Sequence, residues 1–559
     1  ALPMPVPERV QSVLAARIGR LAPDDRRVLL AASAIGKDVP LPFLELITDQ
    51  SEEQLRPSLR RLQAAELLYA TRVGPSPEYA FKHALTHEVA YQSLPTEIRR
   101  QHHEQFVKAI ESRSPAVART KPELHAHHAV RGELWDTAAR SCMQAGARSA
   151  GRVAYREALG FFEQASRALA QLPDTPSTRQ RTVDVLLDLA ITRHVLGQRS
   201  EVLDCLRRAE ALAEALDDRR GLGEIAIRMA SHFWYSADPD RALEAGRRSL
   251  ACATDLDDPG QQARSRYLLA EIQQVRGDYR DVIRTVGQIN EIRKGAPLRE
   301  EFRGEVNGLP AVTARSNLAL ALAELGSFAE ATACAEEACR MAEAIDRPSC
   351  RIVACLGLGG VWLRRGEFAN AVPVLESGFR LCEENYLPIA FPWIAASFAY
   401  ASGLAGRVAE APALLQRAIE RAAAMRVLVN QSQRIAWLGE LTLLDGCHDE
   451  AIRLGQDALE LARAHKERGH EAWALRLLGQ AHATRGVSGA RHAEGYYRQA
   501  LEIADERGMR PLQAKCHLGL GRALKVLDGQ VQPDSHLMRA DEIFRQIGMR
   551  DAIQTIAPT

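Results

Sequence analysis

Long hydrophobic runs and aromatic side chains are scarce in this 559-residue sequence, in which aromatic residues make up only 5%. No window of about 18 apolar residues occurs, and the first ten residues lack a charged stretch followed by an apolar one. We therefore expect neither a membrane span nor a signal peptide. We expect a cytoplasmic protein, and because its first residue is alanine, we expect the natural chain to begin further upstream.

A surplus of one charge and closely paired cysteines are also missing. Lysine and arginine number 72 against 71 acidic residues, so no overall field attracts nucleic acid or an anionic membrane. The ten cysteines include no CxxC pair, which argues against a zinc site or a secreted disulfide scaffold. We interpret them as small buried apolar residues in a reducing compartment.

The sequence is instead periodic. From residue 135 onward, apolar residues recur at the three and four spacing of amphipathic helices. One small residue recurs in ten places, at steps of 44, 40, 40 and 49 residues and then five steps of 40. These residues are Gly146, Ala190, Ala230, Ala270, Ala319, Gly359, Ala399, Gly439, Gly479 and Gly519. The register predicts ten units, each with a small residue where two helices approach closely.

Two further markers accompany the first in most units. A glycine stands seven residues later at Gly197, Gly277, Gly326, Gly366, Gly406, Gly446 and Gly486. An alanine stands twelve or fourteen residues later at Ala158, Ala242, Ala331, Ala371, Ala411, Ala451 and Ala493. Because glycine can adopt the left-handed conformation that ends a helix, each unit is predicted to be a helix, a tight turn and a second helix.

The stretch Leu358–Gly359, Gly366–Phe368 and Ala371 resembles the tetratricopeptide repeat (TPR) motif. The units are about six residues longer than the usual repeat of about 34. The resemblance implies an all-α fold, a TPR-like α-solenoid superhelix with a groove along its concave face. We interpret residues 294–308 as an inserted loop in the 49-residue step, and residues 173–176 as a loop in the 44-residue step.

The first hundred residues follow a different pattern. Helices are predicted at residues 8–20, 23–34, 40–47 and 51–68, and two short strands at 68–71 and 79–81. Helices followed by a small hairpin predict a winged helix, so we divide the chain into a winged-helix domain at 1–115 and a repeat domain at 116–559. The helix at 51–68 carries both arginines and glutamates, and DNA binding is therefore not favoured.

Several segments carry a more specific resemblance. They are residues 10–18, 34–37, 79–85, 89–91, 508–512 and 516–521. They look like the region after the ATPase domain in bacterial multidomain proteins that combine a class III adenylate/guanylate cyclase, a STAND-type (AAA-like) NTPase and a TPR region. The resemblance implies ATP or ADP and Mg²⁺ in upstream domains. This chain lacks a phosphate-loop motif, so we expect no enzymatic activity and no cofactor within it.

The family resemblance singles out His83, because a histidine of the winged helix can contact the phosphates of the bound nucleotide in STAND proteins. A packed histidine at a domain junction is the alternative. His83 and His87 together lack a third metal ligand, and a metal site is not favoured. We expect His125, His127 and His128 to be solvated or to cap a helix, and we expect His102 and His103 to lie on a solvated helix face.

The repeat register also predicts partner-binding residues, since the first helix of each unit lines the concave face. The predicted residues are Trp234, Tyr235, Tyr267, Trp393, Tyr400, Trp473 and Arg476. Core packing is the alternative for each aromatic residue. Our leading hypothesis is a regulatory module that binds a protein or peptide and controls the upstream NTPase. The alternatives are the sensor arm of a LuxR-type ATP-dependent activator and a passive TPR scaffold.

Overall fold

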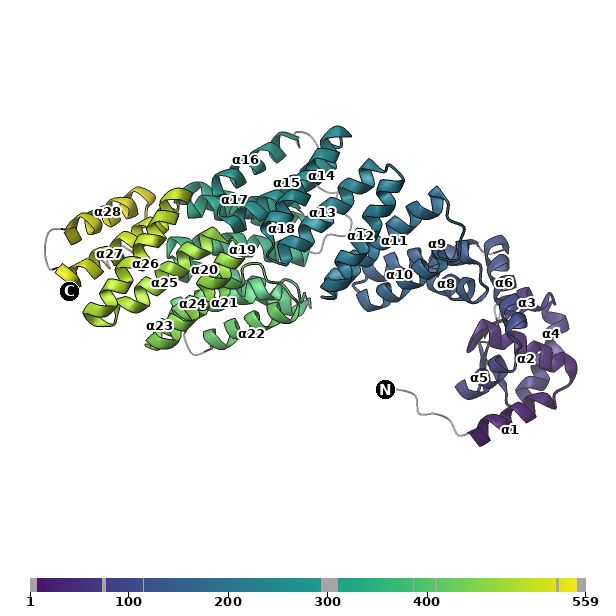
Figure 1. Ribbon diagram of the computed structural model, residues 1–559. Coiled ribbons are helices and arrows are strands. Elements are labelled where there is room, and N and C mark those ends of the chain that lie inside the picture. The colour runs from purple at the N-terminus through teal and green to yellow at the C-terminus, as the bar shows by residue number, and fades with distance from the viewer. Residues whose placement is uncertain are drawn as a thin grey trace. The chain divides into compact units, whose positions relative to one another are not determined.

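The computed structural model describes residues 8–72, 77–113, 115–292, 310–385, 387–407, 410–528 and 532–549. These residues form 28 helices and three strands (Figure 1). No helix among them is long and apolar enough to cross a membrane. The chain divides into two compact units, unit 1 at Ala1–Leu196 and unit 2 at Gly197–Thr559.

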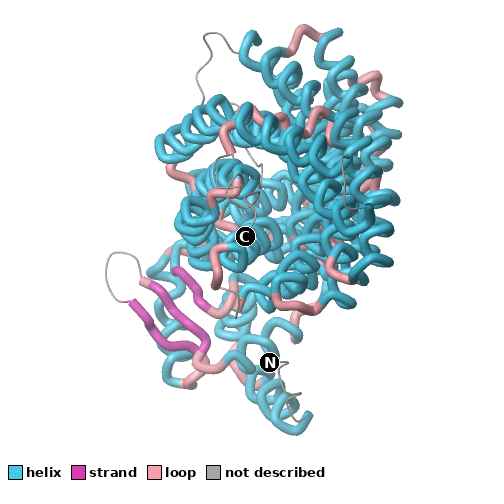
Figure 2. The backbone as a smooth tube through the Cα atoms, turned by 90° about the vertical axis from the view of Figure 1, so that its left-hand side faces the viewer, coloured by secondary structure: helices cyan, strands magenta, loops and turns pink. Residues whose placement is uncertain are grey.

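Unit 1 begins with four helices and a small sheet. The elements are α1 (Glu8–Gly19), α2 (Pro23–Ile35), β1 (Asp38–Pro40), α3 (Leu41–Thr48), α4 (Glu52–Ala64), β2 (Leu68–Arg72) and β3 (Glu78–Phe81). The strands are antiparallel in the order β1-β3-β2 (magenta in Figure 2). The four predicted helices and the hairpin are confirmed, whereas β1 was not predicted. The predicted turn between the hairpin strands includes residues 73–76, which lie outside the described residues.

The rest of unit 1 is helical. Its helices are α5 (Ala84–Gln92), α6 (Thr96–Arg113), α7 (Pro115–Thr120), α8 (Pro122–Arg131), α9 (Trp135–Gly151), α10 (Tyr155–Leu169) and α11 (Pro176–Val195). Helix α6 packs against α3 on one side and α8 on the other, and α8 packs against α9. The predicted boundary at 115 therefore falls within unit 1, and the division into a winged-helix domain and a repeat domain stays a prediction.

Unit 2 is a continuous series of helices that pack against their neighbours in sequence. They are α12 (Arg199–Ala215), α13 (Arg219–Tyr235), α14 (Pro239–Asp255), α15 (Pro259–Arg276), α16 (Tyr279–Ile292), α17 (Pro310–Glu324), α18 (Phe328–Ile345), α19 (Pro348–Arg365), α20 (Phe368–Glu384), α21 (Phe391–Leu404), α22 (Ala411–Ala424), α23 (Gln431–Leu444), α24 (His448–Ala464), α25 (Arg468–Ala483), α26 (Gly486–Arg507), α27 (Arg510–Asp528) and α28 (Gln532–Ile547). The predicted insertion at 294–308 lies outside the described residues.

The predicted register is confirmed in both units. All ten small residues lie in odd-numbered helices from α9 to α27, and each of these helices is followed by its partner. At Gly359 an added Cβ would lie 2.5 Å from Leu375, and at Gly479 it would lie 2.9 Å from Tyr497. Larger residues there would separate the paired helices. The seven turn glycines all have positive φ, from 68° to 91°, and the seven marker alanines are buried.

The histidines of α6 and α8 correct part of the sequence interpretation. His103, His125 and His128 are buried, with exposed fractions of 1%, 5% and 0%, because α8 packs against helices on both sides. The Nδ1 atoms of His103 and His128 lie 2.8 Å apart, so one donates a hydrogen bond to the other. His125 Nδ1 lies 2.7 Å from Ser141 Oγ. The prediction of solvated or capping side chains was wrong for these three residues.

This histidine pair predicts a pH-dependent stability of unit 1. Burial lowers the pKa of His103 to about 3 and that of His128 to about 2, whereas an unfolded histidine has a pKa near 6.5. Below about pH 6.5 the unfolded chain binds protons that the folded unit excludes. The free energy of unfolding should therefore fall as the pH is lowered, by on the order of 1.4 kcal/mol per pH unit for each histidine, and should be unaffected by them above that pH.

Proteolysis of unit 1 in a urea series at pH 5 to 8 measures this dependence. Replacing both histidines by leucine should make the dependence less steep between pH 5 and 6.5, and part of it should remain because the pKa values of His125 and His127 are lowered as well. Replacing the exposed His492 by glutamine is the control and should leave it unchanged. If the free energy of unfolding changed with pH as steeply in the double leucine variant as in the unaltered chain, His103 and His128 would not be the source of the dependence.

A cavity inside the helical repeat array

Unit 2 contains a partly open cavity of about 360 Å³ that is lined mainly by the first helices of its repeat units. The lining comes from α13, α15, α17, α19, α21, α23, α25 and α27, with further residues from the segments that join them. The same register positions recur on it. Trp393 and Trp473 stand six residues before the small residue of their units. Tyr400 and Glu440 stand one residue after the small residue, and Arg364 stands five residues after it.

Five of the seven predicted partner-binding residues line this one cavity: Trp234, Trp393, Tyr400, Trp473 and Arg476. The other two are buried outside the lining. Tyr235 is 1% exposed and packs edge to face against Trp234 and Trp393, and Tyr267 belongs to the hydrophobic core. Binding by all seven stays a prediction, but the structure brings the first five together.

The aromatic residues form two stacked pairs. The rings of Trp234 and Trp393 are parallel within 9°, with centroids 6.3 Å apart. Tyr400 stacks on Trp437 with centroids 4.6 Å apart. Trp437 was not predicted, although it stands two residues before the small residue Gly439 and so satisfies the same helical spacing. These flat apolar faces can hold side chains or peptide planes.

Charged residues of the lining form two ion pairs. Arg364 contacts Glu324 at 2.5 Å, and Arg476 contacts Glu440 at 2.5 Å. Tyr400 also donates a hydrogen bond of 2.7 Å to Glu440. Burial raises the pKa of Glu440, but the charge of Arg476 and the Tyr400 hydrogen bond outweigh this effect and lower the pKa below its ordinary value. The Glu440 carboxylate therefore remains charged and holds Arg476 in place.

Several polar atoms of the lining residues are buried without a hydrogen-bond partner among the described residues. They are Trp234 Nε1, Gln274 Oε1, Asn317 Nδ2, Asn430 Oδ1 and Arg476 Nε. The set contains three donors and two acceptors. Buried polar groups in proteins are nearly always paired, so five unpaired atoms on residues of one lining are an unusual concentration.

The cavity is partly enclosed, because lining helices about five units apart in sequence meet. Helix α15 packs against α25, and α17 packs against α27. We call the set of contacts between these distant units the seam. At one part of the seam, Arg199 Nε donates a hydrogen bond of 3.0 Å to the Met425 carbonyl, and the Leu428 amide donates one of 2.9 Å to the Tyr235 carbonyl.

A chain of alternating charges extends the seam. Asp240 contacts both Lys466 and Arg276, and Asp278 contacts both Arg276 and Arg507. Networks of this kind contribute more than isolated surface pairs. Their main effect here is geometric, since Asp240 contacts Lys466 across 226 residues of sequence and Asp278 contacts Arg507 across 229.

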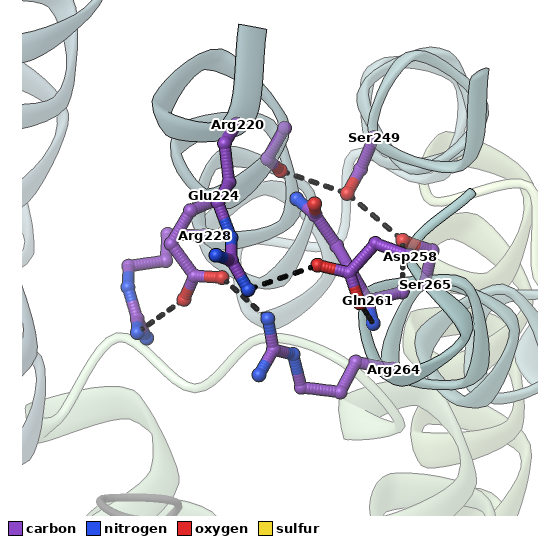
Figure 3. A network of polar contacts seen from close by, with 9 residues as sticks. Arg220, Glu224, Arg228, Ser249, Asp258, Gln261, Arg264 and Ser265 are labelled. Atoms are coloured by element: carbon purple, nitrogen blue, oxygen red, sulfur yellow. Dashed lines mark hydrogen bonds and ion pairs between the residues drawn. The ribbon is translucent and has the colours of Figure 1, made fainter. Parts of the chain in front are cut away.

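A second polar network sets the spacing of two lining helices (Figure 3). Glu224 of α13 contacts Arg228 at 2.6 Å and Arg264 of α15 at 2.9 Å. Deeper between the helices, Ser249 donates to the Gly223 carbonyl at 2.8 Å and lies 2.9 Å from the hydroxyl of Ser265. The network lies toward the first turns of α13 and α15, whereas the cavity residues of these helices lie toward their last turns.

In unit 1, His83 stands at the N-cap position of α5, and its side chain is exposed. Its predicted contact with nucleotide and the alternative, packing at a domain junction, both stay predictions. His87 is half buried and its Nε2 donates a hydrogen bond of 3.0 Å to the Ser33 carbonyl. No group of three potential metal ligands occurs among the described residues.

No family model matches the sequence, and no curated protein sequence is significantly similar to it. Among solved structures, the chain is similar to the APC/C hetero-tetramer Cut9–Hcn1, at 12% identity and a TM-score of 0.50, over 98% of this chain and 92% of that one. It is also similar to a Rap protein complexed with Competence and Sporulation Factor, at 12% identity and a TM-score of 0.43, over 63% and 99% of the two chains.

A third similar structure is a STAND protein with a tetratricopeptide repeat sensor from Pyrococcus horikoshii, at 11% identity and a TM-score of 0.34, over 100% of this chain and 68% of that one. At such low identity a structural similarity shows the fold alone. The similarity to Cut9–Hcn1 and the repeat register together show that the chain has the predicted all-α, TPR-like solenoid fold.

The seam predicts different effects for two glycine-to-alanine substitutions. Gly469 lies against Gly277 and Tyr279, and an added Cβ would collide with the buried Tyr279 hydroxyl. Gly469→Ala should therefore force the seam apart and lower the free energy of unfolding by about 1–3 kcal/mol. Gly495→Ala, on an exposed and unobstructed face of α26, should instead raise it by up to about 1 kcal/mol.

Chemical denaturation and hydrogen exchange of residues 276–282 and 466–472 measure both effects. Faster exchange in these two segments should accompany Gly469→Ala and be absent in Gly495→Ala. Equal stability and equal exchange in the two variants would contradict a closely packed seam.

Proposed function

We propose that unit 2 binds a short, extended peptide segment in its cavity, and that the bound state regulates a neighbouring domain. The observation that carries the proposal is the lining itself, which combines stacked aromatic rings, buried ion pairs and unpaired hydrogen-bonding atoms around one partly enclosed space. Peptide bonds supply both donors and acceptors, and they match a lining that offers both.

The cavity has a volume of about 360 Å³. Its volume lies within the range of about 300–1,000 Å³ that is common for sites of small ligands. A segment of a few residues fits this range.

The regulated domain in this proposal is the STAND-type NTPase of the parent protein, which in turn controls a class III nucleotide cyclase. Residues 1–115 act as a winged helix that relays the state of the bound ATP or ADP, and His83 contacts the nucleotide phosphates. The exposed side chain of His83 at the start of α5 supports this role, because it is accessible to a neighbouring domain.

A regulatory effect requires that the ligand bind two states of the protein with different affinities. The seam offers such states, since opening it would remove one wall of the cavity. A phosphate loop and a cyclase domain encoded before residue 1 would support the proposal. A DNA-binding domain in the parent gene would favour a transcriptional activator, and an upstream region without an NTPase would favour a passive scaffold.

Selection from a displayed library of random heptapeptides tests the binding function with the 559-residue chain as bait. We expect enriched peptides to bind Ser397→Trp at least tenfold more weakly, because Ser397 lines the cavity and tryptophan would fill it. Ser397→Ala is the matched control and should retain binding. Thermal unfolding confirms that both variants are folded.

Two outcomes would contradict the proposal. Enriched peptides that bind Ser397→Trp as well as the unaltered chain would place the binding site elsewhere. A selection that enriches no peptide at all would show that the cavity does not serve peptide binding.

A further inference from the structure

Three cationic side chains from three different helices converge on one tryptophan in the cavity. The guanidinium carbon of Arg364 lies 4.2 Å from the ring centroid of Trp473, and that of Arg476 lies 5.4 Å away. The ammonium group of Lys515 lies 5.3 Å from the same centroid. The indole N–H of Trp473 donates a 3.4 Å hydrogen bond to Glu324, which fixes the ring in place.

Only two of these three cations are paired with a carboxylate in the described part of the chain. Arg364 is held by Glu324 and Arg476 by Glu440. Lys515 has no ion pair or hydrogen bond among the described residues, although it lines the cavity. Glu271, the remaining carboxylate of the lining, lies on α15 and has an interaction partner of its own. The region around Trp473 therefore carries one positive charge in excess.

The surroundings of Lys515 make this excess charge unfavourable. Its side chain is partly exposed, but toward the cavity, so that protein surrounds it. Burial lowers the pKa of Lys515 to about 8, and the positive charges of Arg476 and Arg364 act in the same direction. The carboxylates of Glu440 and Glu324 only partly offset these effects. A bound anion would relieve both the lost hydration and the repulsion.

A hydrogen-bond donor beside Lys515 is also unpaired. Arg476 is 8% exposed, and its Nε is buried without a partner although its other nitrogens contact Glu440 and Gln480. The positions of the two cations agree, because Arg476 and Lys515 lie 5.4 Å and 5.3 Å from the same Trp473 ring centroid, so an anion at Lys515 would lie near both of them.

We infer that the cavity binds a carboxylate group of its ligand at Lys515, between the ammonium group and Arg476 and beside the ring of Trp473. This inference rests on the proposed function, and it narrows the ligand to a peptide with an acidic side chain or a free C-terminus. A monovalent carboxylate neutralises the one excess charge. A divalent phosphate would instead leave a net negative charge beside Glu324 and Glu440, which repels it.

The experiment observes Lys515 directly and needs no selected peptide. The chain has eight lysines, few enough for NMR titration with ¹³C at lysine Cε, and Lys515→Arg assigns the signal. We expect saturating acetate to raise the pKa of Lys515 by about 1 relative to chloride at equal ionic strength, which corresponds to a tenfold preference of acetate for the charged lysine. Lys525, outside the cavity lining, is the internal reference.

Two further probes identify the source of the carboxylate. N-acetylglycine imitates a free C-terminus, and the amide of N-acetylaspartate imitates an acidic side chain; the one with the larger effect on Lys515 identifies the group. Inorganic phosphate is the third probe. An identical titration of Lys515 in acetate and chloride would overturn the inference, and so would a larger effect of phosphate than of acetate.

This result is separable from the peptide-binding proposal. If acetate acts on Lys515 but the heptapeptide selection enriches nothing, the carboxylate site stands and the peptide function fails. The converse is tested with Lys515→Met, by measuring how much more tightly an acidic peptide binds than its asparagine or glutamine analogue. If peptides bind the cavity but this affinity ratio is the same in Lys515→Met and in the unaltered chain, the peptide function stands and the carboxylate site fails.

Discussion

The contact between distant repeat units is the constraint on which the rest of unit 2 depends. In an ordinary solenoid each repeat touches only its neighbours, so a small rotation per repeat leaves the concave face open. Here, units about five apart meet through α15 with α25 and α17 with α27, and charged residues tie their turns together. The concave face thus becomes the wall of a cavity, and its side chains are partly shielded from bulk water.

Enclosure changes the energetic role of the lining residues. Ion pairs such as those of Arg364 and Arg476 would contribute little on an exposed surface. Within the cavity the same charges are surrounded by aromatic and aliphatic groups, and an unpaired charge such as that of Lys515 becomes unfavourable. Ligand recognition and closure of the array are therefore physically linked, since opening the seam would hydrate the groups that favour ligand binding.

The repeat architecture could be predicted from sequence because it depends on local requirements. Close helix pairing needs a small residue, as at Gly359 and Gly479, and a left-handed turn favours glycine, as at Gly277 and Gly366. Even so, Ala237 adopts the left-handed conformation without being glycine, which shows that the fold can impose it. The buried histidines were mispredicted because His128 is polar by type and buried only through the packing of α8 between two other helices.

The candidate site was only partly predictable. Helical spacing placed Trp393, Trp473 and Arg476 on the inner face, and the same spacing could have identified Trp437. The importance of Lys515 could not be recognised, because it depends on which carboxylates are already paired in three dimensions. The seam was equally hidden, since no local pattern indicates that Asp240 and Lys466 meet across 226 residues.

Carbodiimide cross-linking tests the closed array most directly, because it joins a carboxylate and an amine only when they are in contact. The structure predicts an amide cross-link between Asp240 and Lys466, detected by mass spectrometry of the digested chain. The exposed pair Glu104 and Lys108, one helical turn apart on α6, provides the positive control. Recovery of the control cross-link without the Asp240–Lys466 link would contradict the closed array, and with it the partly enclosed cavity.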